Sequence, residues 1–193
     1  PIDVFMSEDE GKSWKRFDSI WDIPFVATVP YPVATVEPHV RDVAVDPKDP
    51  NVLYASLQVG YIVKSTDGGK TWTNVGLKDT RSIARIIVDP TDPNVVYVAA
   101  QGHLWGPNAD RGIFKTTDGG KTFGPPHRLN QAGGAFDPRV AGNGRGVAYA
   151  TWLDERFGMY HLYLNRTTDA GKTWQTTDTK IDVRPEKGGG TFD

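Results

Sequence analysis

The chain has 193 residues, enough for one well-filled core or for several small modules in a row. Its 22 Lys and Arg are balanced by 24 Asp and Glu, which argues against a nucleic-acid partner, and no apolar run approaches the ~20 residues of a membrane-inserted helix. The absence of cysteine excludes disulfides, thiolate metal sites and a thiol nucleophile. With 21 Gly, 14 Pro and 11% aromatic residues, the composition is typical of an all-β protein.

Four segments share the ungapped pattern [S/T]-x-D-x-G-x-[S/T]-[W/F], at residues 7–14, 65–72, 116–123 and 167–174. Their aspartates lie 58, 51 and 51 residues apart, close to the ~50-residue period of the longer propeller repeats. Each copy is typical of a hairpin turn. The Asp accepts hydrogen bonds from turn amides, the Gly takes a positive φ, and the aromatic residue returns to the core.

We predict a structural role for the repeated positions of this pattern, because four equivalent copies do not resemble one active site or one calcium site. No metal site and no cofactor are predicted. The residues assigned this structural role are Asp9, Asp67, Asp118, Asp169, Gly11, Gly69, Gly120, Gly171, Trp14, Trp72, Phe123 and Trp174.

A second repeated element precedes two of these turns, the sequence D-P-x-D-P-N at residues 46–51 and 89–94. Proline fixes φ and lacks an amide donor, so both stretches are predicted to be loops between strands. One repeat is therefore a four-stranded unit, with this loop after the first strand and the Asp-containing turn after the third. We assign such units to residues 41–78, 82–128 and 136–180, with a partial unit at 1–20.

The repeats resemble the Asp-box, or bacterial neuraminidase repeat, β-propellers. Residues 41–123 are most similar to sortilin-like and xyloglucanase-like repeats, through their D-P-x-D-P-N-V-x-Y turns and Gly112-Ile-Phe-Lys115. Residues 136–174 are more similar to sialidase-type repeats, through Trp152-Leu-Asp-Glu-Arg156. The resemblance implies an all-β fold of four-stranded antiparallel propeller blades and a secreted or periplasmic location.

For function, the resemblance implies a module that binds glycans or is related to glycoside hydrolases of the sialidase or xyloglucanase type. Two alternatives stay open. One is a non-catalytic, protein-binding scaffold of the sortilin-like or assembly-factor kind. The other is an engineered or assembled repeat protein without activity, which would explain why the repeat style changes between residues 123 and 136.

The strand count predicts about three and a half to four blades within a single unit, residues 1–193, whereas propellers typically need at least four blades to close. A chain that opens at Pro1 without an initiator Met is expected to have been trimmed or excised from a longer one. Three outcomes are open. The chain is a portion of a larger propeller, it completes a ring by self-association, or residues 18–40 supply the missing strands.

Functional groups are expected at the end of the blades opposite the Asp-box turns. Glycoside hydrolysis uses paired carboxylates, for which the candidates are Asp110, Asp154 and Glu155. An ion pair capping a hairpin is the structural alternative for the Trp-x-Asp-x-Arg stretch at 152–156. A sialidase binds the carboxylate of its substrate with three arginines and also needs a tyrosine that is activated by a glutamate. No such tyrosine–glutamate couple is evident in this sequence. The residues predicted to contact a glycan or protein ligand are His103, Trp105, Arg111, Arg41, Arg85 and Arg139.

Overall fold

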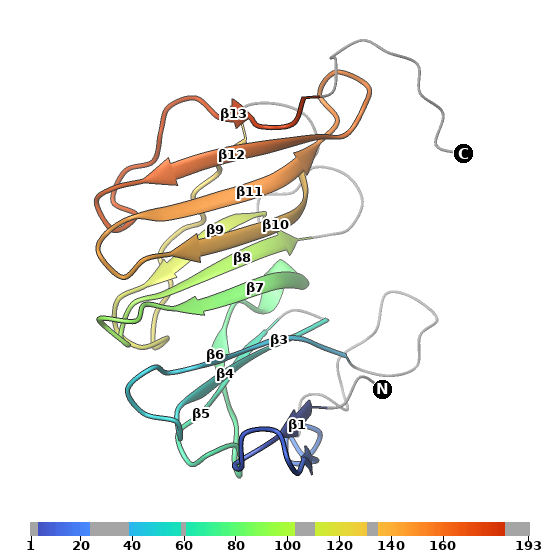
Figure 1. Ribbon diagram of the computed structural model, residues 1–193, viewed down its shortest axis with the longest axis vertical. Helices are drawn as coiled ribbons and strands as arrows, with labels where there is room; N and C mark the ends of the chain where they lie inside the picture. The colour runs from blue at the N-terminus through green and yellow to red at the C-terminus, as the bar shows by residue number, and fades with distance from the viewer. Residues whose placement is uncertain (1–3, 24–38, 59–60, 103–110, 131–134, 184–193) are drawn as a thin grey trace.

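The computed structural model describes residues 4–23, 39–58, 61–102, 111–130 and 135–183. Regular structure in this part of the chain is β, apart from one 3₁₀ turn, η1 (Lys78–Thr80). The strands form four antiparallel sheets, which follow one another in chain order along the long axis of the molecule (Figure 1). The predicted fold class, an all-β stack of propeller-type blades, is confirmed.

Each sheet keeps its strands in sequence order, as expected for meandering blades. The first blade pairs β1 (Val4–Met6) with β2 (Lys15–Phe17). The second blade contains β3 (Val40–Val45), β4 (Leu53–Leu57), β5 (Ile62–Ser65) and β6 (Thr73–Gly76). The third blade contains β7 (Ser82–Val88), β8 (Val96–Gly102) and β9 (Gly112–Thr116), and the fourth contains β10 (Ala135–Gly142), β11 (Ala148–Asp154), β12 (His161–Thr167) and β13 (Thr179–Lys180).

The third blade differs from the expected four strands, because β9 has no full partner strand on its outer side. The chain returns only as an isolated bridge, in which Ile113 and His127 exchange two backbone hydrogen bonds of 3.1 and 2.8 Å. Pro125 and Pro126 precede this bridge. Since proline has no amide to donate, these two residues explain why no regular fourth strand forms.

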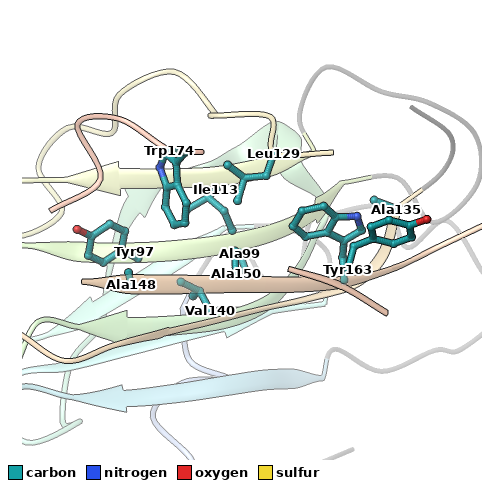
Figure 2. Packing of buried hydrophobic residues seen from close by; sticks show 11 residues of the cluster. Tyr97, Ala99, Ile113, Leu129, Ala135, Val140, Ala148, Ala150, Tyr163 and Trp174 are labelled. Carbon is teal, nitrogen blue, oxygen red and sulfur yellow. The ribbon is translucent and has the colours of Figure 1, made fainter. Parts of the chain in front are cut away.

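Three apolar layers join successive blades. Between the third and fourth blades, Tyr97, Ala99 and Ile113 meet Val140, Ala150 and other side chains of the fourth blade (Figure 2). Alternate residues of each strand face opposite sides, so one sheet contributes to two layers. The buried members of the other two layers are Tyr54, Ile62, Ile83, Ile86, Val88, Val96, Val98, Ala100 and Phe114, and Ile20, Ile23, Val40, Ala55, Leu57 and Val63.

The four Asp-box turns share one hydrogen-bond pattern. In the second blade, Asp67 Oδ1 accepts from the Thr71 amide at 2.9 Å, and Asp67 Oδ2 accepts from the Thr71 hydroxyl at 2.6 Å. The Ser65 hydroxyl donates to Asp67 at 2.8 Å and accepts from the Gly69 amide at 2.8 Å. The same contacts recur around Asp9, Asp118 and Asp169.

In three of the four boxes, the aromatic residue packs toward the preceding blade rather than into its own. Trp72, Phe123 and Trp174 lie against the layers shared with the first, second and third blades, respectively. Trp14, in the box of the first blade, has no preceding blade among the described residues and is 62% exposed. The described residues therefore provide no core layer for Trp14 to enter.

The box carboxylates predict a loss of stability in acid. Hydrogen bonds from the Thr71 hydroxyl, the Thr71 amide and the Ser65 hydroxyl lower the pKa of Asp67 to about 2. Equivalent bonds lower the pKa of Asp9 to about 2, and the pKa values of Asp118 and Asp169 fall further. Stabilisation by a carboxylate with a lowered pKa is complete above its unfolded pKa, about 3.9, and is lost as the pH falls through the folded value.

We therefore expect the urea midpoint of unfolding to hold steady above pH 5 and to fall steadily from pH 4 to pH 2. Replacing Asp67 with Asn should lower the midpoint at pH 7 and make its decline in acid shallower. A wild-type midpoint that does not change between pH 5 and pH 2 would contradict this role of the carboxylates.

A second prediction concerns the close approach of box turns to the preceding blade. A Cβ atom at Gly69, where φ is +83°, would lie 2.0 Å from Cε1 of the Phe17 ring. Gly158 has the same φ of +83°, but a Cβ there would meet nothing within 4 Å. Gly158→Ala should lower the free energy of unfolding by about 1–2 kcal/mol through backbone strain alone. Gly69→Ala should lower it distinctly more, because the new methyl group also clashes with the Phe17 ring. Chemical denaturation of both variants measures the difference, and equal costs would argue against tight packing at Gly69.

Candidate functional site

Backbone strain gathers at the end of the blades opposite the boxes, on the right in Figure 1. Positive φ values occur there at the non-glycine residues Tyr61, Leu77, Arg81 and Asp137. The two other such residues in the described part of the chain, Glu10 and Ala170, occupy the glycine-favouring position of a box. A left-handed non-glycine residue costs on the order of 1–3 kcal/mol, and such residues cluster at ligand sites. This end is therefore the candidate site.

Asp154, a predicted catalytic candidate, lies in a buried ion-pair network. Its side chain is fully buried, and Oδ2 lies 2.7 Å from the Arg156 guanidinium, which also lies 2.6 Å from Asp178. The hydrogen bond to Asp154, and after it the one to Asp178, raises the pKa of Arg156, which also stacks 4.0 Å over the Tyr163 ring. This is the hairpin-capping ion pair that the sequence left as the alternative, with Asp178 as an unforeseen third member.

Glu155, the next candidate, is exposed and lies close to Tyr160. Partial desolvation, and after it the charge and hydrogen-bonding capacity of Glu155, raise the pKa of the Tyr160 phenol. The Tyr160 ring meets the Phe136 ring edge-on at 5.6 Å. No tyrosine–glutamate couple is evident in the sequence, but the tight loop between β11 and β12 brings these two together. A phenol with a raised pKa stays protonated at neutral pH, which suits hydrogen bonding rather than nucleophilic attack.

The three predicted arginines of the inner strands do not share one acceptor. Arg41 donates to the Ser82 hydroxyl at 3.4 Å, which joins β3 to β7. Arg85 lies 3.3 Å from Asp42. Arg139 forms an exposed pair with its neighbour in the β10 bulge, Asp137, at 2.9 Å. A carboxylate clamp of the sialidase kind is therefore not assembled by these three side chains.

Arg111, a predicted ligand-binding residue, lies where β9 begins. Its Nε donates to the Gln101 carbonyl at 2.8 Å, and its guanidinium lies 5.7 Å over the Phe136 ring. It lines a small cavity of about 30 Å³ between the third and fourth blades, room for about one water molecule. The remaining candidates, His103, Trp105 and Asp110, lie outside the residues that the structure describes.

The described residues contain neither a candidate metal site nor a candidate membrane-spanning helix. No three His, Asp or Glu side chains among them are grouped so that they could hold a metal ion. None of the helical structure found in these ranges is long and apolar enough to cross a membrane. The side chains that do lie at the candidate site are aromatic rings, exposed carboxylates and arginines.

Comparison with known proteins identifies the repeat and the fold. The family model of the BNR/Asp-box repeat matches residues 63–74, and no curated protein matches the chain. The crystal structure of a GH74 enzyme from Niastella koreensis superposes with a TM-score of 0.61 at 17% identity, covering 89% of this chain and 25% of that one. The GH74 xyloglucanase from Xanthomonas campestris superposes with a TM-score of 0.61 at 17% identity, covering 96% of this chain and 27% of that one.

A third structure, YCF48 from Cyanidioschyzon merolae, gives a TM-score of 0.48 at 19% identity and covers 76% of this chain and 38% of that one. The chain thus spans about a quarter of the length of the two GH74 structures. At these identities, the superpositions with the GH74 structures establish a shared fold.

Two Asp-x-Arg pairs in the fourth blade offer a matched test of the buried network. Arg156→Met would leave Asp154 and Asp178, which are 0% and 3% exposed, side by side without a cation. Breaking a buried pair in this way should reduce the free energy of unfolding by about 3–5 kcal/mol. Arg139→Met removes the partner of an aspartate that is 54% exposed, and should cost less than about 1 kcal/mol. Urea unfolding measures both. Similar losses would contradict a structural role for Arg156.

Proposed function

Because the chain is an Asp-box repeat protein built from β-propeller blades, we propose that it is a glycan-binding module. The ligand is a neutral polysaccharide of the xyloglucan kind, held at the end of the fourth blade opposite its box. The proposal includes a location outside the cytoplasm, where such polymers occur. The observation that carries it is the grouping of exposed aromatic rings with exposed hydrogen-bonding groups at this end.

The aromatic part of this surface comes from one loop and one strand. Phe157 is 51% exposed and Tyr160 is 37% exposed, both in the loop between β11 and β12. Phe136 at the start of β10 packs against Tyr160. Aromatic side chains present broad apolar faces, and Tyr adds a hydroxyl. Such faces suit the C–H surface of a hexose ring, which displays its hydroxyls at the rim.

Hydrogen-bonding groups flank these rings. Glu155 is exposed beside Tyr160, and the Asp137–Arg139 pair follows Phe136 directly along β10, with both side chains more than half exposed. A few fixed polar groups beside an apolar surface are the usual means of orienting a ligand. The fold shared with the GH74 structures supports the substrate class, since one of the two GH74 proteins described above is a xyloglucanase.

Binding without hydrolysis is the form of the proposal that the described residues favour. A glycosidase needs two carboxylates about 5–10 Å apart at an accessible site. Asp154 is fully buried against Arg156. It therefore cannot serve as the second accessible carboxylate beside Glu155.

Isothermal titration calorimetry with xyloglucan oligosaccharides tests the proposal. Phe157→Ser should weaken binding about tenfold, equivalent to about 1.4 kcal/mol, because a stacking face is lost. Tyr149→Ser, which removes an exposed aromatic residue on the outer face of the same blade, serves as the matched control and should leave the affinity unchanged.

Absence of binding to xyloglucan and to other glycans would refute the proposal and favour the protein-binding scaffold. Hydrolysis of xyloglucan that is abolished by Glu155→Gln would contradict the non-catalytic form.

A further inference from the structure

The first turn of the fourth blade differs in sequence from the first turn of the second and third blades. In those two blades, the first strand is followed directly by an aspartate, Asp46 or Asp89. Oδ1 of each aspartate accepts from the amide two residues later at 2.8 Å and from the amide three residues later at 3.2 Å. In the fourth blade, Asn143 follows β10 directly and takes this place.

Asn143 makes the same kind of contacts through its side-chain oxygen. Its Oδ1 accepts from the Arg145 amide at 2.8 Å and from the Val147 amide at 3.1 Å. Its own backbone amide donates to the Val147 carbonyl at 3.0 Å. Among the described residues, no hydrogen bond is donated by the side-chain NH₂ group of Asn143 or by the Gly144 amide. The asparagine is therefore held by its oxygen alone.

Asn143 and Gly144 form the single Asn-Gly pair in the sequence. The backbone nitrogen that follows an asparagine can attack the side-chain carbonyl carbon, and glycine hinders this attack least because it has no Cβ. The attack turns Oδ1 into an oxyanion, and two amides already donate to that oxygen. Donors placed where negative charge develops lower the barrier to such a step. The turn that holds Asn143 thus also favours the loss of its side-chain amide.

We propose that Asn143 is a site of deamidation in the folded protein. The Gly144 nitrogen forms a bond to Cγ of Asn143, the bond from Cγ to Nδ2 breaks, and Nδ2 leaves as ammonia with the proton of the Gly144 amide. Water then opens the resulting succinimide at one of its two carbonyl carbons. Opening at Cγ yields aspartate, and opening at the backbone carbonyl yields isoaspartate. Apart from water, every group in these steps belongs to residues 143–147.

The two products should affect the blade differently. Aspartate is the residue type that the second and third blades carry at this place, and a charged acceptor strengthens the two bonds to Oδ1. Isoaspartate adds one carbon atom to the main chain directly before Gly144. The Gly144 carbonyl accepts from the Thr91 hydroxyl at 2.7 Å, and a Cβ at Gly144 would lie 2.5 Å from Pro90. Because the third and fourth blades meet this closely here, isoaspartate should loosen their contact.

Incubation of the full chain in warm, mildly alkaline buffer, followed by peptide mapping with mass spectrometry, tests the proposal. The peptide that contains Asn143 should gain the mass of an amide-to-acid change and should contain both products. Asn74 is the internal control, because it is exposed and its Oδ1 accepts from the Gly76 amide at 2.8 Å, but Val75 follows it. Asn143 should convert at least about tenfold faster than Asn74, since the β-branched valine crowds the attacking nitrogen.

Two results would overturn the proposal. One is an Asn143 that keeps its amide in the folded chain under conditions in which the same chain, unfolded in urea, loses it, because the turn would then protect the side chain. The other is conversion of Asn143 no faster than that of Asn74. The proposal concerns the box end of the stack and does not depend on the glycan site.

Stability measurements test the predicted effect of each product. The urea midpoint of Asn143→Asp should equal or exceed that of the wild type, because this position then matches Asp46 and Asp89. The isoaspartate form, separated from the incubated protein by ion exchange, should have a lower midpoint than Asn143→Asp. Equal midpoints for these two forms would contradict the predicted loosening, and a clearly destabilised Asn143→Asp would contradict the equivalence of the three turns.

Discussion

The rest of the structure depends on one interaction, in which both carboxylate oxygens of an aspartate accept hydrogen bonds from the turn that follows it. In each box, the carboxylate accepts from an amide and a hydroxyl four residues later, as Asp67 does from Thr71. These bonds are strong because the acceptor is charged, and they supply turn amides with the hydrogen-bond partners that the strands do not provide. The turn is thereby fixed in a shape whose glycine can approach the preceding blade, as Gly120 approaches Tyr54. One local motif thus sets both the hairpin and the spacing between blades.

This spacing divides the molecule into two ends with different roles. At the box end, repeated turns and the D-P loops hold the blades together; Thr91 of one such loop, for example, donates to the Gly144 carbonyl of the next blade at 2.7 Å. At the other end, the connections are irregular, strained residues such as Asp137 occur, and aromatic rings such as Phe157 stand exposed. The end without this repeated packing is where we propose the ligand surface, since binding residues are often carried by loops on a rigid scaffold.

The repeat made the fold predictable, because four boxes and two D-P loops fix most strand boundaries through local chemistry. The missing fourth strand of the third blade could have been predicted as well, since Pro125 and Pro126 remove two amide donors. Contacts between distant segments could not. Asp178 joins Arg156 from beyond the following box, and Glu155 reaches Tyr160 only because their loop is tight. The exposure of Trp14 follows from the direction in which box aromatics pack, which a single sequence repeat does not reveal.

Amide hydrogen exchange followed by NMR tests the central claim most directly, because each box aspartate accepts from one identifiable amide. These are the amides of Ser13, Thr71, Thr122 and Thr173, whose nitrogens lie 2.8–3.0 Å from Oδ1 of their aspartates in bonds that are all exposed to solvent. The account predicts that all four exchange far more slowly than unprotected peptide amides, despite their place at the surface. Exchange of these four amides at unprotected rates, in a chain whose strands are protected, would contradict it.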